Sequence, residues 1–163
     1  MHAGWKRLLY GRSLRRTLIR SAFWAAGLYL VLGGLARPML VRGRSMEPTV
    51  RDGRLRFAHM WRYAFRPPER GDIVVITMPG GRTFYCKRIV GLPGERVAFA
   101  DGALLVNGEA RAEPYLRDHG GWTVPPVDLV AGTYYVVGDN RSMPMSEQVA
   151  GVVARRHIAG GLW

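Results

Sequence analysis

The sequence predicts a mainly β protein, in which a single N-terminal transmembrane helix is followed by a compact antiparallel β domain. Two observations support this fold class. Residues 21–36 form an uncharged apolar run, and the chain beyond residue 40 consists of short β-branched runs separated by glycine-rich turns, without long helical periodicity. The length of 163 residues leaves room for one modest domain, and a hydrophobic content of 48% argues against a disordered chain.

The positive charge gathers around the apolar run. The chain carries 24 Lys and Arg residues and 12 acidic residues, which gives a net charge of +12. Nine of the basic residues and no acid lie in residues 1–46, so the other 15 basic and 12 acidic residues differ by only three. Basic residues beside an apolar segment are typical of contact with anionic lipid headgroups. We therefore expect the lipid bilayer, and no nucleic acid, among the partners.

The apolar run is interpreted as a membrane anchor. Its 16 residues between Arg20 and Arg37 would span roughly 24 Å as a helix, slightly less than the roughly 30 Å of a bilayer core. Flanking residues extend the anchor to 17–40 if the two arginines reach toward the headgroups. A buried core helix would show a polar face, and a cleaved signal peptide would end in a small-x-small site. Neither feature is evident, and both readings stay open as alternatives.

The anchor divides the chain into three segments. We expect residues 1–16 to form a basic cytoplasmic segment, residues 17–40 the anchor, and residues 41–163 the β domain. Because basic residues precede the anchor, we expect the N-terminus in the cytoplasm and the β domain on the extracytoplasmic side of the cytoplasmic membrane. The sequence leaves the oligomeric state open.

Short β-branched runs mark the expected strands of the β domain. They are bounded by glycine-containing turns, of which Asp101-Gly102 and Asn107-Gly108 are typical of tight hairpins. The expected strands cover residues 72–77, 83–90, 96–100, 103–106 and 133–137. Residues 110–130, rich in Pro and Gly, are expected to form a long loop.

Ser45 is the candidate nucleophile, in the segment Arg42–Thr49 with the sequence RGRSMEPT. It follows a glycine-containing turn, and the residue before Pro48 is biased toward extended backbone, so the serine can lie on a fixed and exposed elbow. A serine hydroxyl needs a base to remove its proton. None of the four histidines adjoins a recognisable motif. The sequence therefore does not support a histidine triad.

Lys87 is the candidate base. It is one of two lysines, with Lys6, among 24 basic residues, and it lies within the apolar run FYCKRIVG. Arginine cannot lose its proton at workable pH, whereas burial can lower the pKa of a lysine until it acts as a base. In an alternating strand Lys87 faces away from Cys86, which we expect to be a structural thiol.

Four segments in order resemble the type I signal peptidase family. Residues 45–49 (SMEPT) resemble its nucleophile box, residues 71–75 (GDIVV) a conserved strand, and residues 87–95 (KRIVGLPGE) its lysine box. Residues 138–141 (GDNR), with Ile158 and Gly160, resemble its last box. The match covers roughly residues 20–163, with the anchor in its expected place.

The resemblance implies a membrane-bound serine endopeptidase that removes signal peptides from exported precursor proteins. Its Ser45–Lys87 dyad would need no cofactor or metal, and it suggests the bacterial or mitochondrial type. The resemblance further implies a substrate pocket and oxyanion site beside the nucleophile, at Gly43, Arg44 and Met46. It implies support of the site by these residues of the last box: Asp139, Asn140, Arg141, Ser142 and Ser146.

The last box departs from the family pattern. Pro144 stands where the family has a serine near the lysine amine, and Ser146-Glu147-Gln148 replaces an Asp-Ser-Arg run. The bracing Asp–Arg pair is therefore expected to be missing, with Ser142 or Ser146 as substitutes for the lysine's hydroxyl partner. Two alternatives follow: a dedicated maturation protease for one precursor, or a catalytically weak membrane protein that binds precursors.

Overall fold

The structure is a computed structural model, and it describes residues 14–35, 37–78 and 83–163. The basic residues Lys6, Arg7 and Arg12 of the predicted cytoplasmic segment lie outside the described residues. The elements are α2 (Leu14–Leu35), β1 (Arg37–Leu40), β2 (Leu55–His59), η1 (Arg62–Ala64), β3 (Ile73–Thr77), β4 (Phe84–Gly91), β5 (Arg96–Ala100), β6 (Ala103–Val106), β7 (Glu109–Ala110), β8 (Val124–Asp128), β9 (Thr133–Val137), η2 (Met145–Glu147), β10 (Gly151–Ala154), η3 (Arg155–His157) and β11 (Ile158–Leu162).

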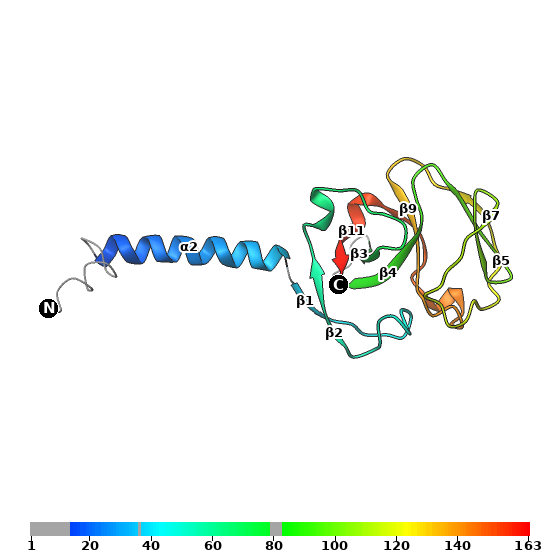
Figure 1. Ribbon diagram of the computed structural model, residues 1–163, viewed down its shortest axis with the longest axis horizontal. Helices are drawn as coiled ribbons and strands as arrows, with labels where there is room; N and C mark the ends of the chain where they lie inside the picture. Colours follow the sequence, from blue (N-terminus) through cyan, green and yellow to red (C-terminus); the bar gives the residue numbers. More distant parts are fainter. Residues whose placement is uncertain (1–13, 36, 79–82) are drawn as a thin grey trace.

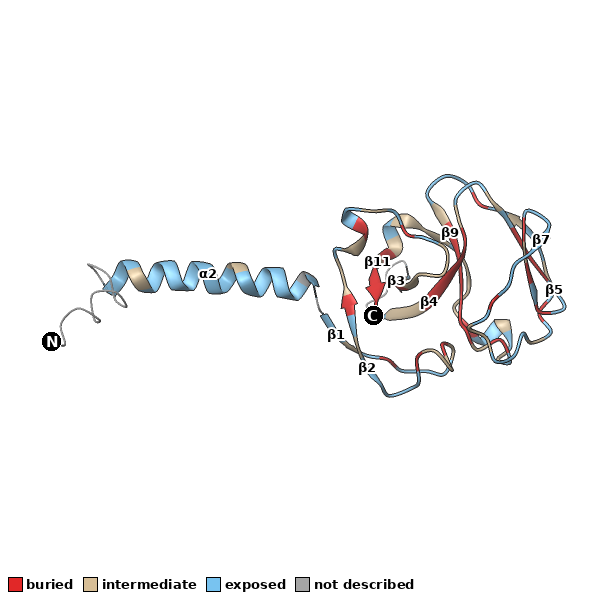
Figure 2. Cartoon of the chain, in the orientation of Figure 1, coloured by how far each residue is buried: buried red, intermediate tan, exposed pale blue. Residues whose placement is uncertain are grey.

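The described strands form two antiparallel sheets, which confirms the mainly β prediction (Figure 1). The larger sheet has the order β1-β2-β11-β3-β4-β9-β10, and the smaller has the order β7-β6-β5-β8. β4 therefore lies inside the larger sheet, between β3 and β9. Figure 2 shows buried residues along β4, β9 and β11, so the candidate base is on one of the best-packed strands.

An apolar core joins the two sheets. Val90 and Val137 from the larger sheet pack with Val97, Phe99 and Val106 from the smaller one. Alternating strand residues bring one face of each sheet into this core. A separate cluster lies around Met46, which is 1% exposed and packs with residues of β2, β3 and β11. The residue after the candidate nucleophile is therefore anchored in the domain.

The hairpin turns confirm the reading of the Asp-Gly and Asn-Gly pairs. Asp101 and Gly102 have φ angles of 46° and 82°, and Asn107 and Gly108 have φ angles of 55° and 85°. Two successive positive φ angles are typical of type I′ turns, which match the twist of the flanking strands. The strand bounds predicted for residues 96–100, 103–106 and 133–137 agree with β5, β6 and β9.

The predicted long loop over residues 110–130 is wrong in part, because it contains β8. This strand pairs with β5, with Val127 opposite Val97. It lies at the edge of the smaller sheet, where Pro125 and Pro126 remove donors that an edge strand does not require. Because two consecutive prolines are atypical of a strand, the sequence alone did not predict β8.

The N-terminal helix α2 extends away from the β domain (Figure 1). Its large apolar residues are exposed, including Phe23 at 75% and Trp24 at 72%, so the alternative of a buried core helix is wrong. The predicted boundary at residue 40 is also wrong, because the helix ends at Leu35 and Arg37–Leu40 pairs with β2 as β1. Within the described ranges, no helix combines the length and mean hydropathy required of a bilayer-spanning segment.

Candidate active site

The candidate nucleophile Ser45 lies in a compact turn between β1 and β2. Gly43 enters the turn with a φ of 100°, a conformation that favours glycine. Within the turn, the Glu47 N–H donates to the Arg44 carbonyl at 3.1 Å, and the Val50 N–H donates to the Met46 carbonyl at 2.9 Å. These bonds and the buried Met46 side chain fix the backbone on both sides of the serine.

The structure brings Lys87 and Ser45 together. The Lys87 Nζ donates a hydrogen bond to the Ser45 Oγ at 2.6 Å, across 42 residues of sequence. Lys87 is 2% exposed, and burial lowers its pKa to about 8. Burial acts in this direction because a low-dielectric surrounding penalises the ammonium form. A neutral lysine amine is therefore accessible near neutral pH, within reach of the serine proton.

Asn140 holds the nucleophile turn through two hydrogen bonds. Its backbone N–H donates to the Ser45 carbonyl at 2.9 Å, and its Nδ2 donates to the Arg44 carbonyl at 3.1 Å. The Ser142 Oγ donates to the Asn140 Oδ1 at 2.6 Å, which orients the amide. Asn140 and Ser142 thus support the turn and not the lysine.

A buried ion pair connects β4 to the turn that carries Asn140. The Arg88 Nε and Nη2 donate to the two oxygens of Asp139 at 2.8 and 2.6 Å. Thr49 belongs to the nucleophile segment, and its Oγ1 donates to Asp139 at 2.6 Å. Arg88 and Asp139 are 8% and 1% exposed, so each charge depends on the other for compensation. The pair thereby ties the strand of Lys87 to both turns around Ser45.

A narrow groove opens beside the dyad. Its cavity of about 60 Å³ is lined by Ser45, Lys87 and mostly apolar neighbours: Met39, Leu40, Val41, Arg42, Gly43, Met46, Phe84, Tyr85 and Cys86. β9 pairs with β4 only from Arg88 onward, so the described strands leave the β9-side edge of residues 84–87 unpaired. The structure therefore places Gly43 and Met46 among the residues that line this groove. Burial raises the pKa of the Cys86 thiol, which favours its protonated form.

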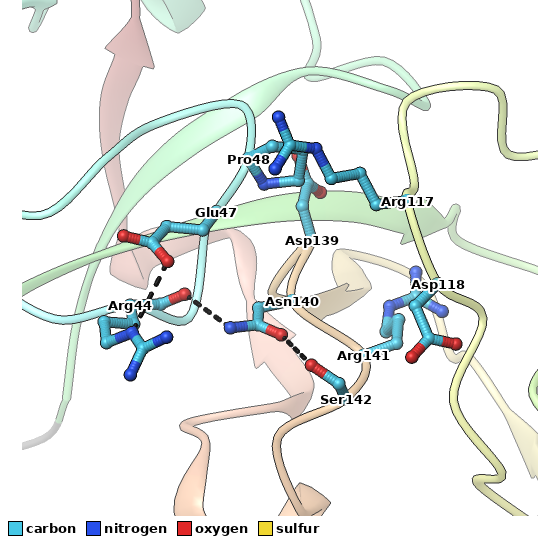
Figure 3. A pocket seen from close by; sticks show the side chains of 9 residues that line it. All are labelled: Arg44, Glu47, Pro48, Arg117, Asp118, Asp139, Asn140, Arg141 and Ser142. Carbon is cyan, nitrogen blue, oxygen red and sulfur yellow. Dashed lines mark hydrogen bonds and ion pairs between the residues drawn. The ribbon is translucent and has the colours of Figure 1, made fainter.

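A second, polar cavity of about 190 Å³ lies on another side of the nucleophile turn (Figure 3). Arg44 lines this cavity and not the groove, with its Nε 3.4 Å from Glu47 Oε2. Ser146 is an exposed residue of η2. In the described part of the chain, the Ser45 Oγ is the one hydrogen-bond partner of the Lys87 amine, and neither Ser142 nor Ser146 takes the place of the missing hydroxyl.

Comparison with known proteins identifies the family. A family model described as signal peptidase, peptidase S26, matches residues 15–162. The chain belongs to this family. Signal peptidase I of Bacillus licheniformis is 34% identical over 142 residues, covering 80% of this chain and 76% of that protein. Signal peptidase I T of Bacillus subtilis (strain 168) is 37% identical over 142 residues, covering 77% of this chain and 71% of that protein.

A solved signal peptidase I from Enterococcus faecalis V583 is 28% identical, with a TM-score of 0.44, over 60% of this chain and 98% of that one. Family membership makes this signal peptidase a serine endopeptidase, as the sequence predicted.

The last box of this signal peptidase is held by Glu113 and Gln148. Both are buried, and neither was predicted from the sequence as a site residue. The Arg141 guanidinium donates to Glu113 at 3.1 and 2.5 Å and to the Gly138 carbonyl at 2.9 Å. Gln148 accepts from the Gly138 N–H at 3.2 Å and donates to the Asn140 carbonyl at 2.5 Å. The family's Asp–Arg run is absent here, and Glu113 instead supplies an acid partner for Arg141 from a distant loop.

Proposed function

We propose that this signal peptidase cleaves signal peptides from exported precursor proteins, with Ser45 as nucleophile and Lys87 as general base. The observation that carries the assignment is the 2.6 Å contact between the serine hydroxyl and a lysine that is 2% exposed. A lysine whose pKa is lowered to about 8 has a substantial neutral fraction at physiological pH. That fraction can accept the serine proton during attack.

The dyad supports acyl transfer in two stages. Neutral Lys87 takes the proton of Ser45 as the Oγ attacks the scissile carbonyl carbon, and the resulting ammonium then gives a proton to the departing amine. In the second stage water attacks the acyl carbon while Lys87 accepts the water proton, and the ammonium then gives this proton to the departing Ser45 Oγ, which restores the serine hydroxyl. The lysine ends each cycle neutral, so protons balance without a second acid.

The Ser45 backbone N–H is the proposed oxyanion donor. Among the described residues it donates to no acceptor, whereas the Gly43 N–H donates to Asp52 Oδ1 at 2.8 Å. Gly43 is therefore occupied, and its predicted part in the oxyanion site passes to Ser45. A backbone donor fixed beside the nucleophile stabilises charge that develops on the carbonyl oxygen.

The groove suits an extended peptide with small side chains near the scissile bond. The unpaired edge of residues 84–87 offers backbone donors and acceptors to an added strand. The cavity of about 60 Å³, which Met46, Phe84 and Tyr85 help to line, suits a small side chain such as alanine. The geometry thus supports cleavage after small residues.

We further propose that α2 anchors the enzyme in the cytoplasmic membrane, with the N-terminus cytoplasmic and the β domain extracytoplasmic. The helix exposes apolar side chains around its circumference, among them Leu28 at 59%, Tyr29 at 78% and Leu30 at 67%. Such a surface is stabilised by transfer from water to lipid. Arg15, Arg16 and Arg20 lie in its first two turns, where they can meet anionic headgroups.

The experiment compares membranes that contain the wild type, Ser45→Ala or Ser142→Ala in cleavage of a signal-peptide-bearing precursor. Ser142→Ala is the matched control, because Ser142 is exposed and bonds to Asn140, away from Lys87. We expect Ser45→Ala to lower the rate at least about 1,000-fold and Ser142→Ala to lower it less than about tenfold. Product size and N-terminal sequence identify the cleaved bond. Cleavage at the wild-type rate by Ser45→Ala would refute the assignment.

A further inference from the structure

Two side chains from the segment between β7 and β8, Glu113 and Tyr115, contact the elements that carry the dyad. Glu113 and Tyr115 come from a loop that belongs to the smaller sheet, whereas Ser45 and Lys87 belong to the larger sheet and its β1–β2 connection. Glu113 is 4% exposed, although it is a carboxylate in a loop. A buried charge of this kind requires compensation by partners.

The negative charge of Glu113 is compensated by Arg141, which lies in the turn that holds the nucleophile segment. Glu113 accepts two hydrogen bonds from the Arg141 guanidinium, and Arg141 is 1% exposed. The same guanidinium donates to the Gly138 carbonyl, two residues before Asn140. Because Asn140 binds the carbonyl of Ser45, the position of Glu113 is transmitted to the nucleophile through one short turn.

Tyr115 makes the second connection, to the strand of the base. Its hydroxyl donates to Glu113 Oε1 at 2.5 Å, and burial with this bond raises the pKa of Tyr115, so it remains the donor. Its ring lies against Arg88, with the guanidinium carbon 3.9 Å from the ring centroid. Arg88 directly follows Lys87 and binds Asp139. Tyr115 thus covers one face of the buried Arg88–Asp139 pair.

The dyad has little other support at the lysine amine. Within the described residues, the Lys87 amine has the Ser45 Oγ as its one hydrogen-bond partner, and in the sequence Pro144 stands where the resembled family has an additional hydroxyl. The distance between the two groups therefore depends on how firmly the nucleophile turn and β4 are held against each other. If such a contact lengthens by about 1 Å, the reaction loses a large part of its rate.

We propose that Glu113 and Tyr115 are positioning residues that hold Ser45 and Lys87 at reaction distance. This inference rests on the proposed function of the dyad. Neither side chain lines the groove beside Ser45, so their loss acts on the chemical step more than on substrate binding. A loosened turn also admits water to Lys87, which reduces its desolvation and moves its pKa upward.

The test measures kcat, KM and the pH dependence of kcat/KM for full-length Glu113→Gln and Tyr115→Leu in detergent or vesicles. We expect each variant to lower kcat at least about tenfold, to leave KM within about twofold, and to shift the rising limb of the pH profile to higher pH. Tyr115→Phe keeps the ring over Arg88 and removes only the hydroxyl. It should fold and show a smaller loss than Tyr115→Leu.

Glu109→Gln is the matched control, because Glu109 lies just before the same loop and its side chain is 76% exposed. It should retain wild-type kcat and pH dependence. If Glu113→Gln and Tyr115→Phe keep the wild-type kcat and pH profile per folded molecule, the positioning role is overturned, even if their thermal stability falls. Wild type and Ser45→Ala run in the same assay, since equal activity of these two would overturn the dyad itself and not the brace.

Discussion

Lysine is the residue type on which this site depends. The chain uses arginine for 22 of its 24 basic residues, yet places a lysine at position 87. A guanidinium stays protonated at any workable pH, whereas a buried amine loses its proton readily. The choice of lysine therefore has a chemical reason at this position, and its burial on β4 supplies the shift that the chemistry needs.

The activity should depend on pH through Lys87. Its ammonium form cannot accept the Ser45 proton, so kcat/KM should fall about tenfold per pH unit below a midpoint near 8 and level off above it. The measurement is kcat/KM from about pH 6 to about pH 10 with a signal-peptide substrate. A profile that is highest in acid would contradict a lysine base.

The sequence located Ser45 and Lys87 and the last-box residues beside them, but not Glu113 and Tyr115. Ser45 and Lys87 each lie in a contiguous motif, and chemistry alone links a serine to a deprotonatable lysine. Glu113 and Tyr115 lie in an irregular segment without periodicity, and Glu113 meets Arg141 only through the fold, 28 residues away. Short motifs record local constraints, whereas such distant pairs leave no pattern in a single sequence.

At the scale of elements, β4 carries the proposed base Lys87 and the ion-paired Arg88 on adjacent residues. Successive side chains of a strand point to opposite faces, so Lys87 and Arg88 serve different sides of the larger sheet. Lys87 lies opposite Val74, and Arg88 lies opposite Ile73. The strand was predictable from its β-branched run. The smaller sheet was predictable only in part, because Pro125 and Pro126 argue against a strand at the position of β8.

The Arg88–Asp139 pair should be far more important for stability than an exposed pair. Asp139→Asn leaves the buried guanidinium without its counter-charge, at an expected cost of about 3–5 kcal/mol in the free energy of unfolding. Asp128→Asn is the matched control, because the Arg96–Asp128 side chains are 60% and 68% exposed. Its expected cost is below about 1 kcal/mol.

Urea unfolding followed by tryptophan fluorescence measures both variants. Equal losses of stability in Asp139→Asn and Asp128→Asn would contradict the account of β4 as the strand that ties the site together.

At the scale of the whole molecule, an exposed apolar helix leads into a well-packed β domain (Figure 2). The apolar surface continues onto β1 and β2, where Leu40 pairs with Leu55 and both are more than half exposed. The groove beside Ser45 lies next to this hairpin. A bilayer that receives α2 would therefore also bring the membrane surface close to the site of cleavage.

Charge placed in α2 should release the enzyme from lipid. Leu28→Lys with Leu32→Lys adds two ammonium groups to a helix whose side chains are exposed, at about 2.5–3.5 kcal/mol each near a bilayer centre. In flotation with phosphatidylglycerol-containing vesicles, the floated fraction should fall at least about tenfold. Val130→Lys, on an exposed residue of the β domain, should float like the wild type. Full flotation of the double variant would contradict the anchor.

The most direct test of the dyad replaces the base and keeps its charge. Lys87→Arg preserves a cation at the same strand position but removes a group that can give up its proton, and Lys87→Ala removes both. We predict that the two variants lose precursor cleavage alike, by at least about 1,000-fold in kcat/KM, while wild-type membranes process the precursor. If Lys87→Arg cleaves within about tenfold of the wild type, Lys87 is not the general base.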